Sequence, residues 1–185
     1  CMSRKAITFF SEGRPYLAFL GPVVDELSKI HDGPVYYLSS DIEDPYLLSP
    51  PNDVKAYFIG KGSAMIYLFS NIKSGTMVMT MPDLNKYHVK RSVHPLHYVY
   101  IFHSMVSTHM VYREGAFDHF DTMLCVGPHQ KEEIRAWEKL RALPAKNLKN
   151  HGYGPLDTLM LSASEHHIHD PNCPNILVAP SWGPK

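Results

Sequence analysis

The sequence has few cysteines, no excess of either charge and no long apolar run. Its three cysteines, Cys1, Cys125 and Cys173, show no CxxC spacing, which argues against a disulfide scaffold and against a zinc ribbon. Eighteen basic side chains balance eighteen acidic ones, so no charge pattern favours nucleic acid as a partner. No apolar segment approaches the roughly 18 residues of a membrane-spanning helix, and no signal peptide is recognisable. We therefore expect a protein of a reducing, cytoplasmic compartment.

The 185 residues are 44% hydrophobic, which suits one globular domain with a sizeable core. Short apolar runs alternate with segments of helical periodicity, a pattern typical of right-handed βαβ units. The sequence therefore predicts an α/β fold of Rossmann-like type, with a mostly parallel sheet of about seven strands and helices on both faces. The predicted strands are Ala6–Phe10, Pro34–Ser39, Val54–Ile59, Thr76–Thr80, Tyr98–Phe102, Thr122–Val126 and Asn147–His151.

Apolar residues recur at helical spacing over Leu17–Ile30, but Pro22 falls inside this window. Because proline is best tolerated in the first helical turn, we expect the regular helix to start near Gly21. The segment Asp41–Asp53 is rich in Pro, Asp and Ser and is predicted to be a loop. Further helices are expected at Ala64–Ile72, Pro128–Leu140 and Leu156–Ser162.

A histidine stands where the strand Tyr98–Phe102 ends. His103 is followed by Ser104 and Ser107, and ligands of parallel α/β sheets bind beyond the carboxyl ends of the strands. A neutral imidazole accepts a proton from an attacking hydroxyl near neutral pH. His103 is therefore the candidate general base, with a purely structural histidine as the alternative.

Two other loops are candidates for ligand contacts. Glu12, Gly13 and Arg14 follow the first strand and either contact a polar substrate or form a surface turn in which the two charges pair. Gly60–Ser63 follows the third strand, where backbone N–H groups can hold a phosphate. It lacks the spacing of a P-loop and of a dinucleotide-binding motif, so a tight turn is the simpler interpretation and no cofactor is predicted.

The histidines do not form a recognisable metal motif. His103, His109 and His119 match neither HExxH nor a zinc-finger spacing. Glu165–Asp170, which holds three further histidines, is interpreted as a solvated linker. Cys125 lies in a presumed buried strand and is a poor candidate for a nucleophile. No metal site is predicted.

Three stretches together resemble the CDP-glycerol glycerophosphotransferase family of teichoic acid synthesis. Phe102-His103-Ser104 is similar to a strand end with a His-Gly-Thr-Pro type motif, with Ser104 in place of the glycine. Asp121–Gly127 is similar to the strand that follows, and Gly152–Asp157 to the family's GYPR-x-D turn. Ile176–Ser181 is similar to the strand that opens the family's second domain.

The resemblance implies one half of a two-domain GT-B architecture. Residues 1–170 would be the acceptor-side domain, and residues 171–185 the link and first strand of a second domain that holds most of a CDP-activated alcohol donor. We expect this fragment alone to be inactive. The acceptor would be a cell-envelope polymer or a lipid-linked precursor, reached by peripheral contact with the inner face of the membrane. His103 would be the general base, and the substrate-binding residues would be Glu12, Gly13, Arg14, Ser104, Ser107, Gly127 and His129.

Two alternatives remain open at this stage. A GT-B nucleotide-sugar glycosyltransferase or a UDP-sugar epimerase shares the same architecture. A non-catalytic binding domain in envelope assembly would also account for the α/β pattern.

Overall fold

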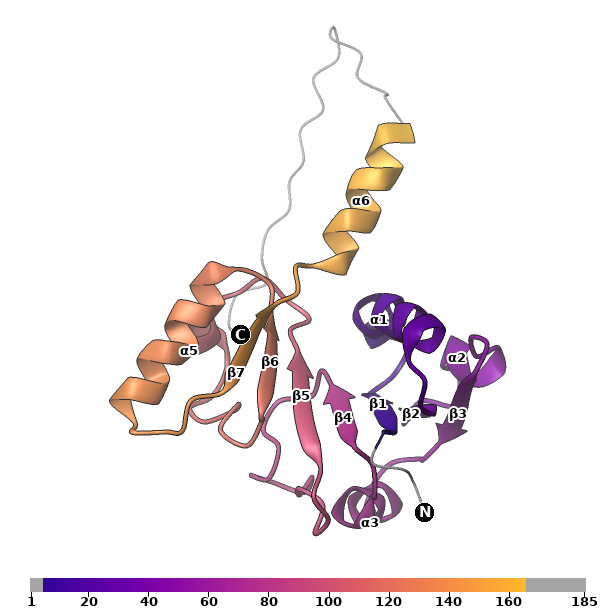
Figure 1. The fold of residues 1–185 in the computed structure, drawn as a ribbon, viewed down its shortest axis with the longest axis horizontal. Helices are drawn as coiled ribbons and strands as arrows, with labels where there is room; N and C mark the ends of the chain where they lie inside the picture. Colours follow the sequence, from indigo (N-terminus) through magenta and orange to yellow (C-terminus); the bar gives the residue numbers. More distant parts are fainter. Residues whose placement is uncertain (1–4, 166–185) are drawn as a thin grey trace, which may run out of the picture. The chain divides into compact units, whose positions relative to one another are not determined.

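The computed structural model describes residues 5–165, and its centre is one sheet of seven parallel strands (Figure 1). The strand order is β3-β2-β1-β4-β5-β6-β7, and all six strand pairs are parallel. The Rossmann-like α/β prediction is therefore confirmed, with an all-parallel sheet. The strands are β1 (Ile7–Ser11), β2 (Val35–Ser39), β3 (Val54–Phe58), β4 (Thr76–Met79), β5 (His97–Ile101), β6 (Thr122–Cys125) and β7 (Asn147–Asn150).

Helices connect successive strands, except between β4 and β5. The segment between those two strands, residues 80–96, crosses back without a helix. The helices are η1 (Arg14–Tyr16, a 3-10 turn), α1 (Leu17–Ile30), α2 (Pro45–Leu48), α3 (Ser63–Asn71), α4 (Thr108–Val111), α5 (Pro128–Leu140) and α6 (Gly154–Glu165).

The expected start of α1 near Gly21 is wrong, because the helix begins at Leu17 and contains Pro22 in its interior. Leu20 and Val24 are fully buried on this helix, and their packing outweighs the hydrogen bond that the proline removes. The proline leaves the Ala18 carbonyl without its usual helical hydrogen-bond donor. Ala18 and Pro22 are both exposed. Water can therefore satisfy that carbonyl.

The segment Asp41–Asp53 is not entirely a loop, because it contains the short helix α2. The buried Asp44 caps this helix by accepting a hydrogen bond from the Tyr46 backbone N–H at 3.0 Å. Its other carboxylate oxygen accepts from the hydroxyls of Tyr37, at 2.9 Å, and Ser39, at 2.8 Å. Asp44 is an effective N-cap, and it links α2 to β2.

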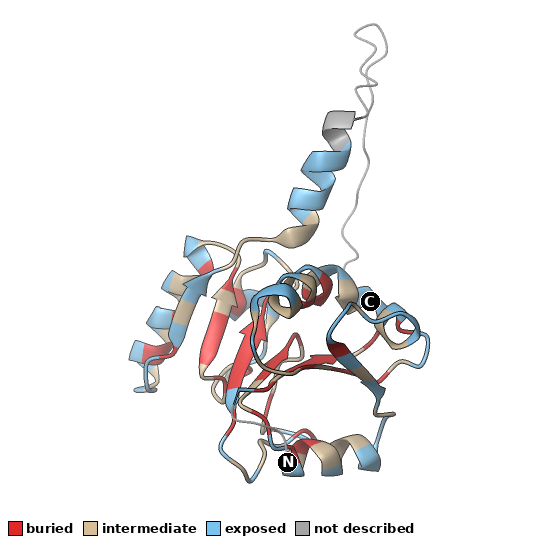
Figure 2. Ribbon diagram, turned by 45° about the vertical axis from the view of Figure 1, so that its right-hand side comes forward, coloured by how far each residue is buried: buried red, intermediate tan, exposed pale blue. Residues whose placement is uncertain are grey.

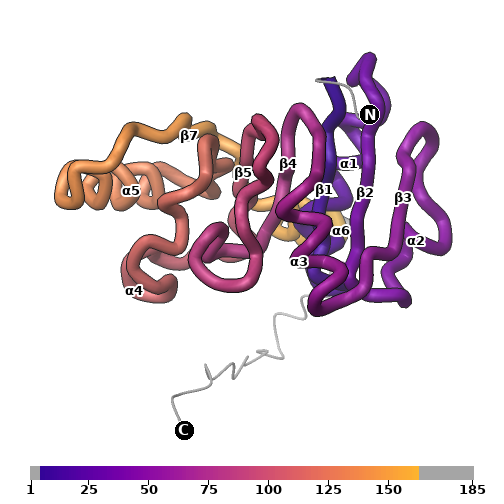
Figure 3. The backbone as a smooth tube through the Cα atoms, turned by 90° about the horizontal axis from the view of Figure 1, so that it is seen from below, coloured from indigo at the N-terminus to yellow at the C-terminus, as the bar shows by residue number. Residues whose placement is uncertain are grey.

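The sheet is covered on both faces, as predicted, and each face has its own core. On one face α1 packs Leu20 and Val24 against Phe9 of β1. On the other face α3 and α5 contribute Phe69 and Ile134. Figure 1 shows α1 and α3 on opposite sides of β1 and β4, and Figure 3 shows β3, β2, β1, β4 and β5 side by side. The buried residues concentrate on the strands, whereas α5 exposes its outer surface (Figure 2).

The chain divides into two units, residues 1–155 and 156–185, and each is described by itself. Most of α6 belongs to the second unit, where Leu159, Met160 and Leu161 are exposed. The expected strand in Ile176–Ser181, the boundary at residue 171 and the histidines of Glu165–Asp170 lie outside the described residues. Within residues 5–165, no helix is both long and apolar enough to cross a membrane.

Candidate functional site

The carboxyl ends of β1 and β4 mark the point where the strand order reverses, which we call the switch point. β1 pairs with β2 on one side and with β4 on the other, and the chain winds outward from this pair in both directions. Ligands of open parallel sheets bind beyond the carboxyl ends of the strands at such a point. The loops after β1, β4 and β5 are therefore the segments where a ligand is expected.

The loop after β1 depends on Gly13. Its φ of +149° and ψ of −175° belong to a region that is essentially restricted to glycine. The buried Ser11 hydroxyl accepts from the Gly13 N–H at 3.2 Å and donates to the Gly13 carbonyl at 3.0 Å. A Cβ atom at Gly13 would lie 3.1 Å from a carboxylate oxygen of Asp41. Gly13 therefore shapes this loop rather than offering a free N–H to a ligand.

The two charged residues of this loop, Glu12 and Arg14, do not pair with each other. The Arg14 guanidinium donates to Glu43 at 2.8 Å, and both side chains are largely exposed. Glu12 is half-buried, and its carboxylate makes no hydrogen bond or ion pair with the residues that the structure describes. Burial raises the pKa of the Glu12 carboxyl. The carboxylate lies close enough to Tyr16 and Tyr100 to raise the pKa of both hydroxyls.

His103 follows β5 and lies among aromatic rings from three segments. Its ring centroid is 5.6 Å from Tyr16, 6.0 Å from Phe19 and 6.4 Å from Tyr112. Burial lowers the pKa of the imidazole, and the backbone of Thr80 offsets part of that lowering. The ring is therefore neutral at pH 7 and can accept a proton. Its Nδ1 is buried and has no hydrogen bond of normal geometry.

Unpartnered polar atoms concentrate around the carboxyl ends of β4 and β5. Buried polar atoms normally find a partner, so exceptions need an explanation. Four side-chain atoms of the described residues are buried without one, and all belong to β5 or to the segments that follow β4 and β5. They are Thr80 Oγ1, Asp83 Oδ1, Tyr100 Oη and His103 Nδ1.

Ser104 and Ser107 have different surroundings. The Ser104 hydroxyl lies 3.2 Å from the Tyr112 hydroxyl, and that tyrosine packs against His103. Ser107 instead lies 2.9 Å from Nδ1 of His109, at the start of α4. The structure therefore places Ser104 beside His103 and Ser107 in a separate cluster with His109.

This second cluster does not form a catalytic triad. Glu133 accepts from the backbone N–H and the hydroxyl of Thr108, at 2.5 and 2.7 Å, and so caps α4. Its other oxygen lies 3.5 Å from the same His109 Nδ1 that contacts Ser107. A triad needs the serine and the acid on opposite ring nitrogens. The Ser107–His109–Glu133 cluster is therefore interpreted as a helix cap.

Gly127 and His129 lie at the start of α5. Gly127 has an extended backbone with φ −156°, which any residue adopts, and His129 is exposed. The next residue, Gln130, is fully buried. Its amide donates to the carbonyls of Ser104 and Val106, both at 3.2 Å, and its oxygen accepts from the Val126 N–H at 2.9 Å. Gln130 therefore ties the loop after His103 to the end of β6.

Sequence reasoning missed Tyr16, Tyr100, Tyr112 and Gln130. Tyr100 is an ordinary aromatic residue of a strand by its pattern, and Tyr16 and Tyr112 are separated from His103 by 87 and 9 positions of sequence. No spacing connects them to a histidine at a strand end. Their only signal is an aromatic residue shortly after a strand, which is common in any sheet protein.

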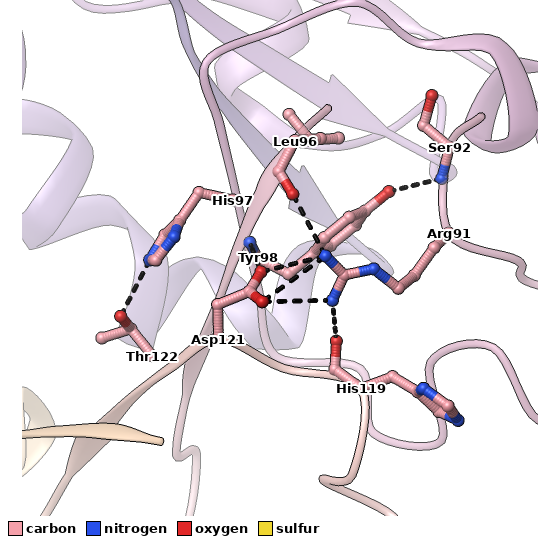
Figure 4. Close-up of polar contacts among 8 residues, drawn as sticks. All are labelled: Arg91, Ser92, Leu96, His97, Tyr98, His119, Asp121 and Thr122. Atoms are coloured by element: carbon pink, nitrogen blue, oxygen red, sulfur yellow. Dashed lines mark hydrogen bonds and ion pairs between the residues drawn. The ribbon is translucent and has the colours of Figure 1, made fainter. Parts of the chain in front are cut away.

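A different polar cluster lies at the opposite end of the strands, where β5 and β6 begin (Figure 4). Arg91 donates to the Asp121 carboxylate at 3.1 Å and to the carbonyls of Leu96 and His119, and its guanidinium lies 4.6 Å from the Tyr98 ring centroid. Asp121 also accepts from the Tyr98 N–H at 2.7 Å. The Tyr98 hydroxyl accepts from the Ser92 N–H at 2.8 Å. These groups satisfy one another, so we interpret this cluster as structural.

A hollow between the loop at residues 112–118 and α5 is also lined with charge, and several of its charged side chains pair with one another. Arg141 makes two hydrogen bonds of 2.8 Å to Asp118 and an ion pair of 3.2 Å to Glu114.

Cys125 is buried in β6, and burial raises its pKa to about 11, so its thiol is unreactive at neutral pH.

The described residues, 5–165, contain no group of three or more His, Cys, Asp or Glu side chains placed to hold a metal ion. Comparisons of the chain with protein-family models, with curated proteins and with solved structures found no match.

Proposed function

We propose that this chain is the acceptor side of a transferase that moves glycerol phosphate, or a related alcohol phosphate, from a CDP-activated donor to a hydroxyl group. The observation that carries the proposal is the neutral, half-buried imidazole of His103 beside the switch point, with a buried Nδ1 that makes no hydrogen bond of normal geometry with the described residues. The sequence resemblance of Phe102–Ser104, Asp121–Gly127 and Gly152–Asp157 to CDP-glycerol glycerophosphotransferases supports the choice of donor.

In the proposed reaction His103 accepts the proton of the acceptor hydroxyl as its oxygen attacks the β-phosphorus of the donor. A bond forms between this oxygen and phosphorus, and the bond from phosphorus to the oxygen bridging to CMP breaks, so that CMP leaves with the bonding electrons. A general base of this kind contributes about 10²- to 10⁴-fold to a rate.

The surrounding residues support this role in different ways. Tyr16, Phe19 and Tyr112 pack around the imidazole, which limits access of water and keeps the ring uncharged. Gln130 holds the loop that follows His103. The phosphates and the nucleotide would be held mainly by a second domain, and the acceptor would be a cell-envelope polymer or its lipid-linked precursor at the cytoplasmic face of the membrane.

The test is release of CMP from CDP-glycerol by the full-length protein that contains this chain. His103→Gln is expected to lower kcat by about 10²-fold or more. The matched control is His88→Gln, which changes an exposed histidine and is expected to leave kcat unchanged. Unchanged turnover in the folded His103→Gln protein would remove His103 from the mechanism. If the protein turns over UDP-sugars and not CDP-glycerol, the donor is a nucleotide sugar and the proposed CDP-activated donor is wrong.

A further inference from the structure

The Tyr100 hydroxyl makes no hydrogen bond of normal geometry with the residues that the structure describes. Its side chain is fully buried, and its ring packs against Phe102 at 4.9 Å and against Phe120 at 5.1 Å. A buried hydroxyl without a well-formed hydrogen bond costs stability. A ligand that supplies the missing partner would recover that cost.

The surroundings of the Tyr100 hydroxyl are mostly apolar, but other polar groups approach it. Burial raises the pKa of Tyr100 well above its ordinary value. The Tyr112 hydroxyl, which makes a hydrogen-bonding contact of poor geometry with Tyr100, adds to that effect, as do the Glu12 carboxylate and the Tyr16 hydroxyl. Tyr112 also contacts the Ser104 hydroxyl at 3.2 Å. Three tyrosine hydroxyls and one carboxylate, from three separate segments, therefore lie close together, and two of these tyrosines, Tyr16 and Tyr112, pack against His103.

Within residues 5–165, no positively charged side chain contributes to the pKa shift of this carboxylate. The pKa of Glu12 is shifted by burial alone, and among the described residues no lysine or arginine contributes to the shift at His103 either. Arg14, the nearest arginine in sequence, is paired with Glu43. An anionic ligand such as a phosphate would meet a carboxylate and no cation, which is unfavourable.

We propose that Glu12 and the hydroxyl groups of Tyr16, Tyr100 and Tyr112 bind an uncharged polyhydroxylated ligand, a sugar or a polyol, beside His103. Each tyrosine hydroxyl both donates and accepts, and a carboxylate accepts two or more hydrogen bonds, which matches the hydroxyls of such a ligand. The rings of Tyr16 and Tyr112 offer flat apolar surfaces for its carbon skeleton.

A quaternary ammonium ligand would also suit a carboxylate among aromatic rings. It has no hydrogen-bond donor or acceptor, however, and would leave the Tyr100 hydroxyl unsatisfied. The uncharged polyhydroxylated ligand is therefore the better match. This inference rests on the proposed function, because it names the class of hydroxyl substrate that His103 would deprotonate.

The test is an NMR titration of the 15N-labelled chain with three separate probes: methyl glucoside, glucose 1-phosphate and choline. We expect methyl glucoside to bind most tightly and to shift the amide resonances of Gly13 and Ser104. Tyr100→Phe and Glu12→Gln are each expected to weaken this binding about fivefold, the effect of one lost hydrogen bond. The matched control is Tyr98→Phe, on the same strand but at the opposite edge of the sheet, which is expected to bind like the original.

The inference is overturned if glucose 1-phosphate or choline binds more tightly than methyl glucoside, if none of the three binds saturably, or if Tyr98→Phe weakens binding as much as Tyr100→Phe. Binding needs no donor, so His103→Gln is expected to retain it. The two proposals can therefore fail separately. If Tyr100→Phe loses polyol binding but His103→Gln turns over normally, His103 is not the base, and the binding site remains supported.

Discussion

The two ends of the parallel strands carry polar clusters of opposite character. We call the end at which the strands begin the amino edge of the sheet, and the end at which they stop the carboxyl edge. At the amino edge, Arg91, Asp121 and Tyr98 satisfy one another and the neighbouring backbone. At the carboxyl edge, Tyr100 and His103 keep polar atoms that are buried and unpartnered. Tyr98 and Tyr100 make the contrast plain, because both are buried in the same core on one strand, two residues apart.

This contrast separates a cluster that holds the fold together from one that is available to a ligand. A satisfied network contributes to stability and leaves no group free to bind anything else. An unsatisfied buried group costs stability and therefore calls for an explanation, and a ligand that supplies the partner is one such explanation. The predictions below test whether the two edges differ in this way, in order of decreasing effect.

Asp121→Ala should have the largest effect on stability. It removes the carboxylate that accepts from Arg91 and from the Tyr98 N–H, and hydrogen bonds to charged groups contribute about 1.5–3 kcal/mol. We expect the free energy of unfolding, measured by urea titration, to fall by about 2 kcal/mol. Glu43→Ala, which breaks the exposed pair with Arg14, should cost less than about 1 kcal/mol. Equal losses would show that the amino-edge cluster is no more than a surface ion pair.

Gly13→Ala should destabilise the carboxyl edge by about 1–2 kcal/mol, because alanine is strained at φ +149°. Gly127→Ala is the matched control in the loop after β6. Its backbone is extended, and an added Cβ would meet only the end of the exposed His129 side chain, at 3.0 Å. Urea titration of both variants should therefore show the larger loss for Gly13→Ala, and the reverse order would contradict the described loop.

Tyr98→Phe and Tyr100→Phe compare the two edges directly. Tyr98→Phe removes the acceptor of the Ser92 N–H and should lower the free energy of unfolding by about 1 kcal/mol. Tyr100→Phe removes a hydroxyl without a partner and should leave the stability unchanged or raise it by up to about 1 kcal/mol. Thermal unfolding of the two variants measures the difference. A loss in Tyr100→Phe as large as that in Tyr98→Phe would mean that the hydroxyl is satisfied.

The smallest effect is expected from pH. Burial lowers the pKa of His103, His119 and His151, whereas the unfolded chain keeps the ordinary value of about 6.5. The unfolded state therefore binds more protons, so stability is complete above about pH 6.5 and falls as the pH decreases through the lowered values. Urea titrations at several pH values should show this slope. His103→Gln should flatten it in part, and His88→Gln should not.

Much of the fold was predictable from the sequence. Seven strands were expected within one or two residues of their observed bounds, because apolar runs between polar turns are local patterns. Their parallel arrangement followed from the alternation of strands with helices. The start of α1 and the presence of α2 were not predicted correctly. In both cases packing or a buried cap decided the outcome, through Leu20 and Val24 in α1 and Asp44 in α2.

The candidate site was predictable only in its location. A histidine at a strand end was enough to select His103, since carboxyl ends of parallel strands meet at one edge. The sequence also selected Arg14 and Ser107, which the structure places with Glu43 and His109 instead. Side-chain direction and pairing depend on neighbours that are distant in sequence, so these details could not be predicted.

The sequence by itself determined the parallel α/β sheet, the edge at which His103 lies and the polar loop after β1, because each of these follows from local pattern and chain connectivity. Only the tertiary structure decided which polar groups are satisfied. Arg91 finds Asp121, 30 residues away, while the Tyr100 hydroxyl makes no hydrogen bond of normal geometry with the described residues and has only a contact of poor geometry with Tyr112. The physical reason is that satisfaction of a buried group depends on the whole of its surroundings, and that is established only when the strands and helices pack.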